Sequence, residues 1–164
     1  MADVYIGIDP GIHHTGLAVI TARSVVLSQV ITAKHDPSID ETLDVHRRSE
    51  LIAERILDTV GALYATGDNP RAIAVETFTD QGGARKQFAG RWKTPYLIGY
   101  LARTLEVDLR ECRLVFQSNN CIRSEALAIA LKQLKDYEKL HERKSDHMHD
   151  AALHALYLCN FLKE

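Results

Sequence analysis

The sequence has few cysteines, and none of them are paired at metal-binding spacing. Its 164 residues include only Cys112, Cys121 and Cys159, an odd number of cysteines that lie far apart without a C-x-x-C pair. This arrangement argues against a disulfide scaffold and a tetrahedral zinc site, so we expect reduced thiols. No apolar run approaches the roughly 20 residues of a membrane span, and the N-terminus lacks a charged segment followed by an apolar one. We therefore expect a soluble protein of the cytoplasm.

The sequence also lacks an excess of charge of either sign. Its formal net charge of -2 gives no overall electrostatic footprint for nucleic acid, so a polyanionic partner would have to be held by a local patch. Internal repeats, low-complexity segments and Pro/Gly/Ser-rich linkers are missing too. With 46% hydrophobic residues, the composition excludes a disordered chain. We predict one domain that spans residues 1–164.

Short apolar runs and helical periodicities follow one another along the chain. Runs rich in β-branched residues predict strands at Val4–Ile8, Leu17–Ile20, Val25–Ile31, Ala72–Val75 and Leu114–Gln117. Helices are predicted at Asp40–Tyr64, Pro95–Leu105, Arg123–Leu134 and Asp146–Leu162. The buried face of the first helix is predicted to hold Val45, Ile52, Ile56, Val60 and Leu63. The short connections between the first three strands favour an antiparallel meander, and the whole pattern predicts an α/β fold with a mixed sheet.

Acidic residues stand at two predicted strand ends and in the last helix. Asp9 ends the first strand, and Glu76 directly follows the fourth. Ligand sites in open α/β sheets gather at the carboxyl ends of strands, and hard divalent cations need converging oxygen ligands. The alternative is that each acid caps the turn that follows it. Asp150 lies in a helix that is apolar nearly all round from Ala151 onward, so its carboxylate needs a partner or a cation.

Three neighbours of Asp150 have open roles. His147 is three residues before Asp150 and Asp146 is four before it, so both roughly share its helix face. Asp146 is either the N-cap of this helix or a further metal ligand. His147 and His149 are either solvated residues of the first turn or part of the site.

The segment IGIDPGIHHTGLAV, residues 6–19, closely resembles the first motif of the RuvC family of Holliday junction resolvases, which is a strand followed by D-P-G, three variable residues and T-G. Ala74-Val75-Glu76 and the later His147-x-x-Asp150-Ala-Ala-Leu stand in the order and at the chain distances of the family's remaining motifs. The resemblance spans essentially the whole chain.

This resemblance implies an RNase H-like fold: a mixed five-stranded sheet whose first three strands are antiparallel, with helices on both faces. It also implies a homodimeric, metal-dependent endonuclease that resolves Holliday junctions in DNA recombination and repair by paired symmetric nicks, leaving a 5′-phosphate and a 3′-hydroxyl. Asp9, Glu76 and Asp150 take the positions of the family's catalytic carboxylates and metal ligands. His147 takes a position where many members carry a fourth carboxylate. We expect two Mg²⁺ ions per active site, or Mn²⁺, which accepts an imidazole ligand more readily.

A local basic patch follows Glu76. No acidic residue occurs between Gln81 and Leu105, and the candidates for DNA contact in or near this stretch are Arg85, Lys86, Arg91 and Lys93. Glycines in the predicted loop over residues 78–94 would let it order on binding. Phe78 is a candidate for stacking on unpaired bases, or it packs under the loop. Arg123 is the only cation after the fifth strand, where members of the family place lysines near the scissile phosphate.

Other functions remain open from the sequence. One is a phage-type or mobile-element nuclease that cuts forks and flaps as well as four-way junctions. Another is a branched-DNA-binding module that has lost catalysis, although costly clustered acids argue against it. A third is a small-molecule phosphotransferase of the actin-like kind, which would need two such domains and an adenosine pocket.

Overall fold

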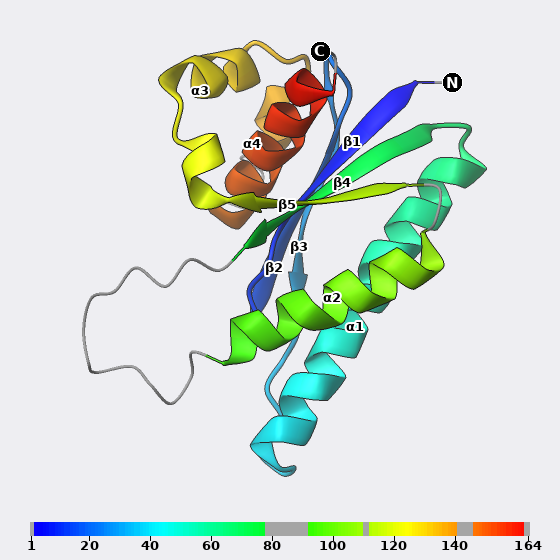
Figure 1. Ribbon diagram of the computed structural model, residues 1–164, viewed down its shortest axis with the longest axis vertical. Helices are drawn as coiled ribbons and strands as arrows, with labels where there is room; N and C mark the ends of the chain where they lie inside the picture. The colour runs from blue at the N-terminus through cyan, green and yellow to red at the C-terminus, as the bar shows by residue number, and fades with distance from the viewer. Residues whose placement is uncertain (1, 78–91, 110–111, 141–145, 163–164) are drawn as a thin grey trace.

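A computed structural model of the protein describes residues 2–77, 92–109, 112–140 and 146–162. The described strands are β1 (Asp3–Asp9), β2 (His14–Ile20), β3 (Val25–Thr32), β4 (Asn69–Thr77) and β5 (Arg113–Ser118). They form one sheet in the order β3-β2-β1-β4-β5, in which β1, β2 and β3 are antiparallel and β4 and β5 run parallel to β1 (Figure 1). The predicted mixed sheet with an antiparallel start is confirmed.

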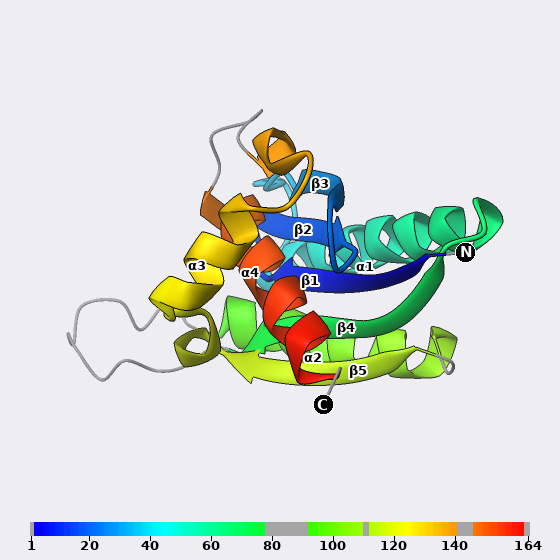
Figure 2. The ribbon, with the colours of Figure 1, turned by 90° about the horizontal axis from the view of Figure 1, so that it is seen from above.

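The described helices cover both faces of this sheet, as predicted. They are α1 (Glu41–Ala65), α2 (Lys93–Asp108), α3 (Glu125–Lys132) and α4 (Asp146–Phe161), with 3₁₀ turns η2 (Asn119–Ile122) and η3 (Tyr137–Leu140). Figure 2 shows α1 and α2 on one face and α3 and α4 on the other. None of the described helices is long and apolar enough to cross a membrane.

The face under α1 and α2 buries one of the two apolar clusters. Ile6 and Ile8 of β1 point to this side, and the five predicted core residues of α1 are all buried in it. α1 begins at Glu41 because the Asp40 side chain accepts hydrogen bonds from the backbone N–H groups of Thr42 and Leu43. Leu97, Leu101 and Leu105 of α2 are buried in the same cluster, so they face their own sheet rather than a partner chain.

The opposite face is covered by α4, which packs directly across β1 and β2. Two glycines allow this close approach: a Cβ atom at Gly7 would overlap the backbone carbonyl of Ala151, and one at Gly16 would overlap that of His147. Alanine at either position would push the helix away from the sheet. These glycines therefore set the height of α4, and with it the position of the side chains that α4 carries.

α2 begins two residues before the predicted boundary, at Lys93, with Pro95 in its first turn, where a missing N–H costs nothing. α3 is shorter than predicted and begins at Glu125, because the Ser124 side chain accepts a hydrogen bond from the Leu127 N–H. Cys112, Cys121 and Cys159 form no disulfide bond.

Candidate functional site

Asp9 and Glu76 lie side by side at the carboxyl edge of the sheet. Asp9 is the last residue of β1, and Glu76 stands one residue before the end of β4. The two strands are parallel neighbours with Ile8 opposite Val75, so the next residue of each strand is an acid. Both carboxylates line a small pocket of about 70 Å³ together with Pro10, Thr77, Thr94 and Ile98. The convergence predicted from the two strand ends is present.

α4 carries three polar side chains to the same edge. His147, Asp150 and His154 lie three and four residues apart, so they share one face of the helix. His147 Nδ1 lies 2.6 Å from Asp9 Oδ2. Asp150 is half-buried, with His149 Nδ1 3.9 Å from its Oδ1. Asp146, the first residue of the helix, has an exposed side chain.

Glu76 is held by two side chains, neither of which the sequence analysis identified. His154 Nε2 lies 3.1 Å from Oε2 and donates to it, because a carboxylate oxygen only accepts. Asn119 Nδ2 donates to Oε1 at 3.0 Å. His154 is fully buried, and its Nδ1 lies 2.9 Å from Gln117 Oε1. Each oxygen of Glu76 therefore has a fixed donor.

These contacts separate the pKa values of the two strand-end carboxyls. Burial raises the pKa of Asp9 to about 6, and repulsion from Glu76 and Asp150 adds to this, although the hydrogen bond to His147 works against it. Burial also raises the pKa of Glu76, but the hydrogen bonds from His154 and Asn119 more than offset it and leave that pKa below its ordinary value. Glu76 is therefore the more acidic member of the pair, and Asp9 loses its proton at a higher pH.

The side chains that could bind a metal ion form hydrogen bonds with neighbouring side chains of the site. No group of three or more His, Cys, Asp or Glu side chains is arranged to hold a metal ion in the part of the chain that the structure describes. Asp9 is bound to His147, and Glu76 is bound to His154 and Asn119. Their chemistry nevertheless fits a divalent cation, since two neighbouring carboxylates repel each other and an imidazole nitrogen lies against one of them.

Two of the six predicted DNA contacts can be located. Arg123 is exposed just after η2, and its Nε donates to Asn119 Oδ1 at 3.1 Å, so it reaches Glu76 through one intermediate side chain. Lys93 Nζ pairs with Glu41 Oε1 at 2.5 Å at the start of α2. The other four, Phe78, Arg85, Lys86 and Arg91, lie outside the described residues.

Comparison with solved structures identifies the fold. The structure of T. thermophilus RuvC in complex with a Holliday junction substrate matches with a TM-score of 0.70 and 20% identity, over 98% of this chain and 94% of that one. A second T. thermophilus RuvC structure matches with a TM-score of 0.69, 18% identity and coverage of 98% and 95%. The yeast mitochondrial Holliday junction resolvase Ydc2 matches with a TM-score of 0.61 and 15% identity, over 96% of this chain and 82% of that one. No protein-family model matches the sequence, and neither does any curated protein. The chain has the RuvC fold, as the sequence motifs predicted.

Proposed function

We propose that this protein is a metal-dependent, structure-selective endonuclease of the cytoplasm that resolves Holliday junctions by paired nicks, leaving a 5′-phosphate and a 3′-hydroxyl. The observation that carries the proposal is the convergence of Asp9, Glu76, His147 and Asp150 at one edge of a sheet with this fold. Supporting it, T. thermophilus RuvC, which shares the fold, is known in complex with a Holliday junction substrate.

Asp9, Glu76, His147 and Asp150 are the residues that would hold two Mg²⁺ or Mn²⁺ ions. Bound in such a site, these ions would activate a water on one side of a phosphodiester and stabilise the leaving oxygen on the other. The raised pKa of Asp9 supports this assignment, because a bound cation would offset both the burial and the repulsion that raise it. His147 Nδ1 lies 2.6 Å from Asp9 Oδ2, so the two groups would have to exchange this contact for the cation if both became ligands.

The other residues of the site orient these groups. His154 and Asn119 hold both oxygens of Glu76, so its carboxylate is presented in one orientation. Arg123, bound to Asn119, places a positive charge at the rim of the site, where a DNA phosphate would lie. We propose Lys93, Arg85, Lys86 and Arg91 as further phosphate contacts and Phe78 as the residue that stacks on unpaired bases.

Cleavage of a synthetic, mobile four-way junction with Mg²⁺ or Mn²⁺ tests this function, with Asp9→Asn as the inactive control. Symmetric paired nicks in opposed strands support a resolvase. Equal rates on the junction, a fork and a flap would instead indicate the looser branched-DNA nuclease. Junction binding without cleavage in either ion would indicate a DNA-binding module and contradict the proposal.

Replacing His154 should weaken metal binding without unfolding the protein. His154→Leu keeps the volume of the buried side chain but removes the donor that fixes Glu76. Loss of a side chain that orients a metal ligand typically reduces metal affinity by about 10- to 100-fold. We expect titration calorimetry with Mn²⁺ to show this loss, and cleavage to recover at high metal concentration. The exposed Asp58→Asn variant should bind Mn²⁺ as the wild type does. Equal affinity in His154→Leu would contradict the role of His154.

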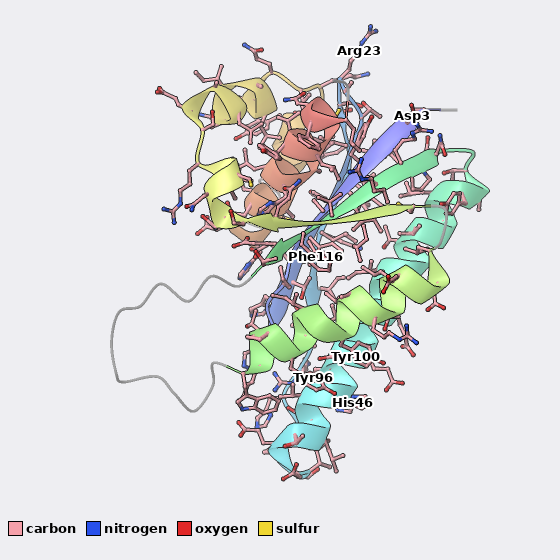
Figure 3. All side chains as sticks on the ribbon, in the orientation of Figure 1. Asp3, Arg23, His46, Tyr96, Tyr100 and Phe116 are labelled. Carbon is pink, nitrogen blue, oxygen red and sulfur yellow. The ribbon has the colours of Figure 1, made fainter. Side chains whose placement is uncertain are left out.

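We also propose that the protein acts as a homodimer through α1 and α2. Figure 3 shows His46, Tyr96 and Tyr100 together between these helices, and Leu43 nearby on α1 is 62% exposed. An exposed apolar and aromatic surface of this kind is typical of an interface. Leu43→Glu should convert the dimer to a monomer in sedimentation experiments, whereas Ile129→Glu on α3, which is 51% exposed on the other face, should not. A wild type that is monomeric at micromolar concentrations would contradict this proposal.

A further inference from the structure

A buried ion pair lies beneath the turn that joins β1 and β2. Asp44 has no exposed surface and Arg48 is 1% exposed, and Arg48 Nη2 lies 2.7 Å from Asp44 Oδ2. Asp44 also accepts from Arg47 and His35 and from the backbone N–H of Asp36. A buried ion pair contributes little net stability, because desolvation of the two charges offsets their attraction. The second terminal nitrogen of the Arg48 guanidinium points to a further role for the pair.

Arg48 holds the ring of His13. Its Nη1 lies 3.1 Å from His13 Nδ1, and because a guanidinium only donates, Nδ1 is the acceptor and the ring proton is on Nε2. Partial burial and the nearby charges of Arg48 and Lys93 lower the pKa of His13, so the ring stays neutral. His13 is exposed, and Nε2 has no partner among the described residues. The result is a fixed N–H donor that faces solvent.

This donor stands in the turn that follows Asp9, one of the proposed catalytic carboxylates. The turn leaves β1 at Asp9, and Thr15 closes it by donating from Oγ1 to the Gly11 carbonyl at 2.9 Å. The backbone carbonyl of His13 accepts from Ala33 N–H at 3.1 Å, which ties the turn to the chain that follows β3. The charge of Lys93 lowers the pKa of His13, and the next residue after Lys93, Thr94, lines the pocket of Asp9.

The charges around His13 favour an anion. The charges of Arg48 and Lys93 lower its pKa, so both contribute positive potential there. The nearby acids have other donors, so none of them occupies the free N–H group. Asp44 is bound to the arginines, Glu41 pairs with Lys93, and Asp36 accepts two hydrogen bonds from Ser38. A phosphate oxygen is an acceptor that suits both the free N–H group and this potential.

We propose that His13, positioned by the buried Arg48–Asp44 pair, contacts a backbone phosphate of the DNA strand beside the carboxylates, with Lys93 supplying the adjacent charge. This assignment rests on the proposed function. The β1–β2 turn would then help to position the DNA strand, in addition to following Asp9 at the end of β1.

The test compares binding of a fluorescent four-way junction in EDTA at pH 8 over a range of salt concentrations. His13→Ala should weaken binding about tenfold at every salt concentration, since it removes one neutral donor to a charged oxygen. Lys93→Ala should make the salt dependence shallower by about one unit of slope, because it removes a charge. His13→Gln should restore most of the affinity, since its amide can accept from Arg48 and still donate outward. Arg23→Ala, at the far end of the sheet in Figure 3, is the control and should bind as the wild type does.

A second measurement leaves the protein unaltered. The ring N–H signals of His13 in a ¹H–¹⁵N spectrum should shift when the junction is added. Shifts with millimolar inorganic phosphate but not with DNA would identify a free-anion site and overturn the assignment. Equal binding by His13→Ala and Arg23→Ala would overturn it as well, while leaving the nuclease proposal intact. A wild type that binds no branched DNA would instead contradict the proposed function, and this assignment with it.

Discussion

Asp9→Asn is expected to reduce junction cleavage by about a thousandfold or more while leaving junction binding close to that of the wild type. Asp9 lies against His147 and beside Glu76, so it is the carboxylate best placed to hold a cation together with both of them. A lost metal ligand removes several kcal/mol of transition-state stabilisation, and each 1.4 kcal/mol is about tenfold in rate. Cleavage assays in Mg²⁺ and Mn²⁺ check the loss of activity, and junction binding measured in EDTA checks that affinity is retained. Retained cleavage would remove Asp9 from the active site.

The same variant is expected to be more stable than the wild type at neutral pH without metal. The folded pKa of Asp9 is raised from 3.8 to about 6, so the unfolded state releases this proton more readily than the folded state. The free energy of unfolding should therefore fall by about 1–3 kcal/mol as the pH rises from about 4 to 6, and stay level above that. Asparagine carries no charge and avoids this cost. The melting temperature of the Asp9→Asn variant in EDTA should therefore exceed that of the wild type at pH 7.5, with little difference at pH 4. A lower melting temperature at pH 7.5 would contradict the raised pKa.

The two strand-end acids could be predicted from the sequence for a local reason. Asp9 follows an apolar run and precedes Pro10-Gly11, which ends a strand, and Glu76 follows another apolar run. In a sheet where β1 and β4 are parallel neighbours, such positions meet at one edge. The local sequence therefore predicted both the strands and the acids at their ends, and the parallel pairing of β1 and β4 brings the two acids together.

His154 could not be identified in this way, because its environment depends on residues far along the chain. It stands in an apolar helix, where a histidine is expected in the core, and its partner Glu76 comes 78 residues earlier. Its spacing of four residues after Asp150 is the one available signal, since it places both side chains on the face that approaches the sheet. Only the close packing of α4, permitted by Gly7 and Gly16, brings the ring to the carboxylate.

The roles of Asp44 and Arg48 were hidden for a similar reason. Acid and base four residues apart on a helix are usually a solvated pair. Here the β1–β2 turn and the segment after β3 lie over them, as the contacts of Arg48 to His13 and of Asp44 to the Asp36 N–H show. Two segments that are distant in sequence cover this pair, so residues whose spacing is typical of a helix surface are buried.

Asp44→Asn is expected to destabilise the protein by about 3–5 kcal/mol, the cost of leaving a buried arginine without its counter-charge. Burial alone would raise the pKa of Asp44, but its bonds to His35, Arg47 and Asp36 and the charge of Arg48 hold that pKa well below its usual range. The stabilisation is therefore complete above about pH 5 and is lost as the pH falls through about 4 and lower. Urea unfolding at pH 7 measures the loss, with the exposed Asp58→Asn on the same helix as control. Equal stability of the two variants would contradict the buried charge network.

A double variant separates stability from positioning. Replacing both partners of a buried ion pair with apolar residues of similar size is often neutral, so Asp44→Leu with Arg48→Met should recover most of the stability that Asp44→Asn loses. Arg47 and His35 can remain solvated in that variant, since their side chains are 42% and 50% exposed. The ring of His13, however, would lose the donor that fixes its tautomer and orientation. We therefore expect the double variant to fold well and yet bind the junction as weakly as His13→Ala. Recovery of both properties would mean that Arg48 serves stability alone.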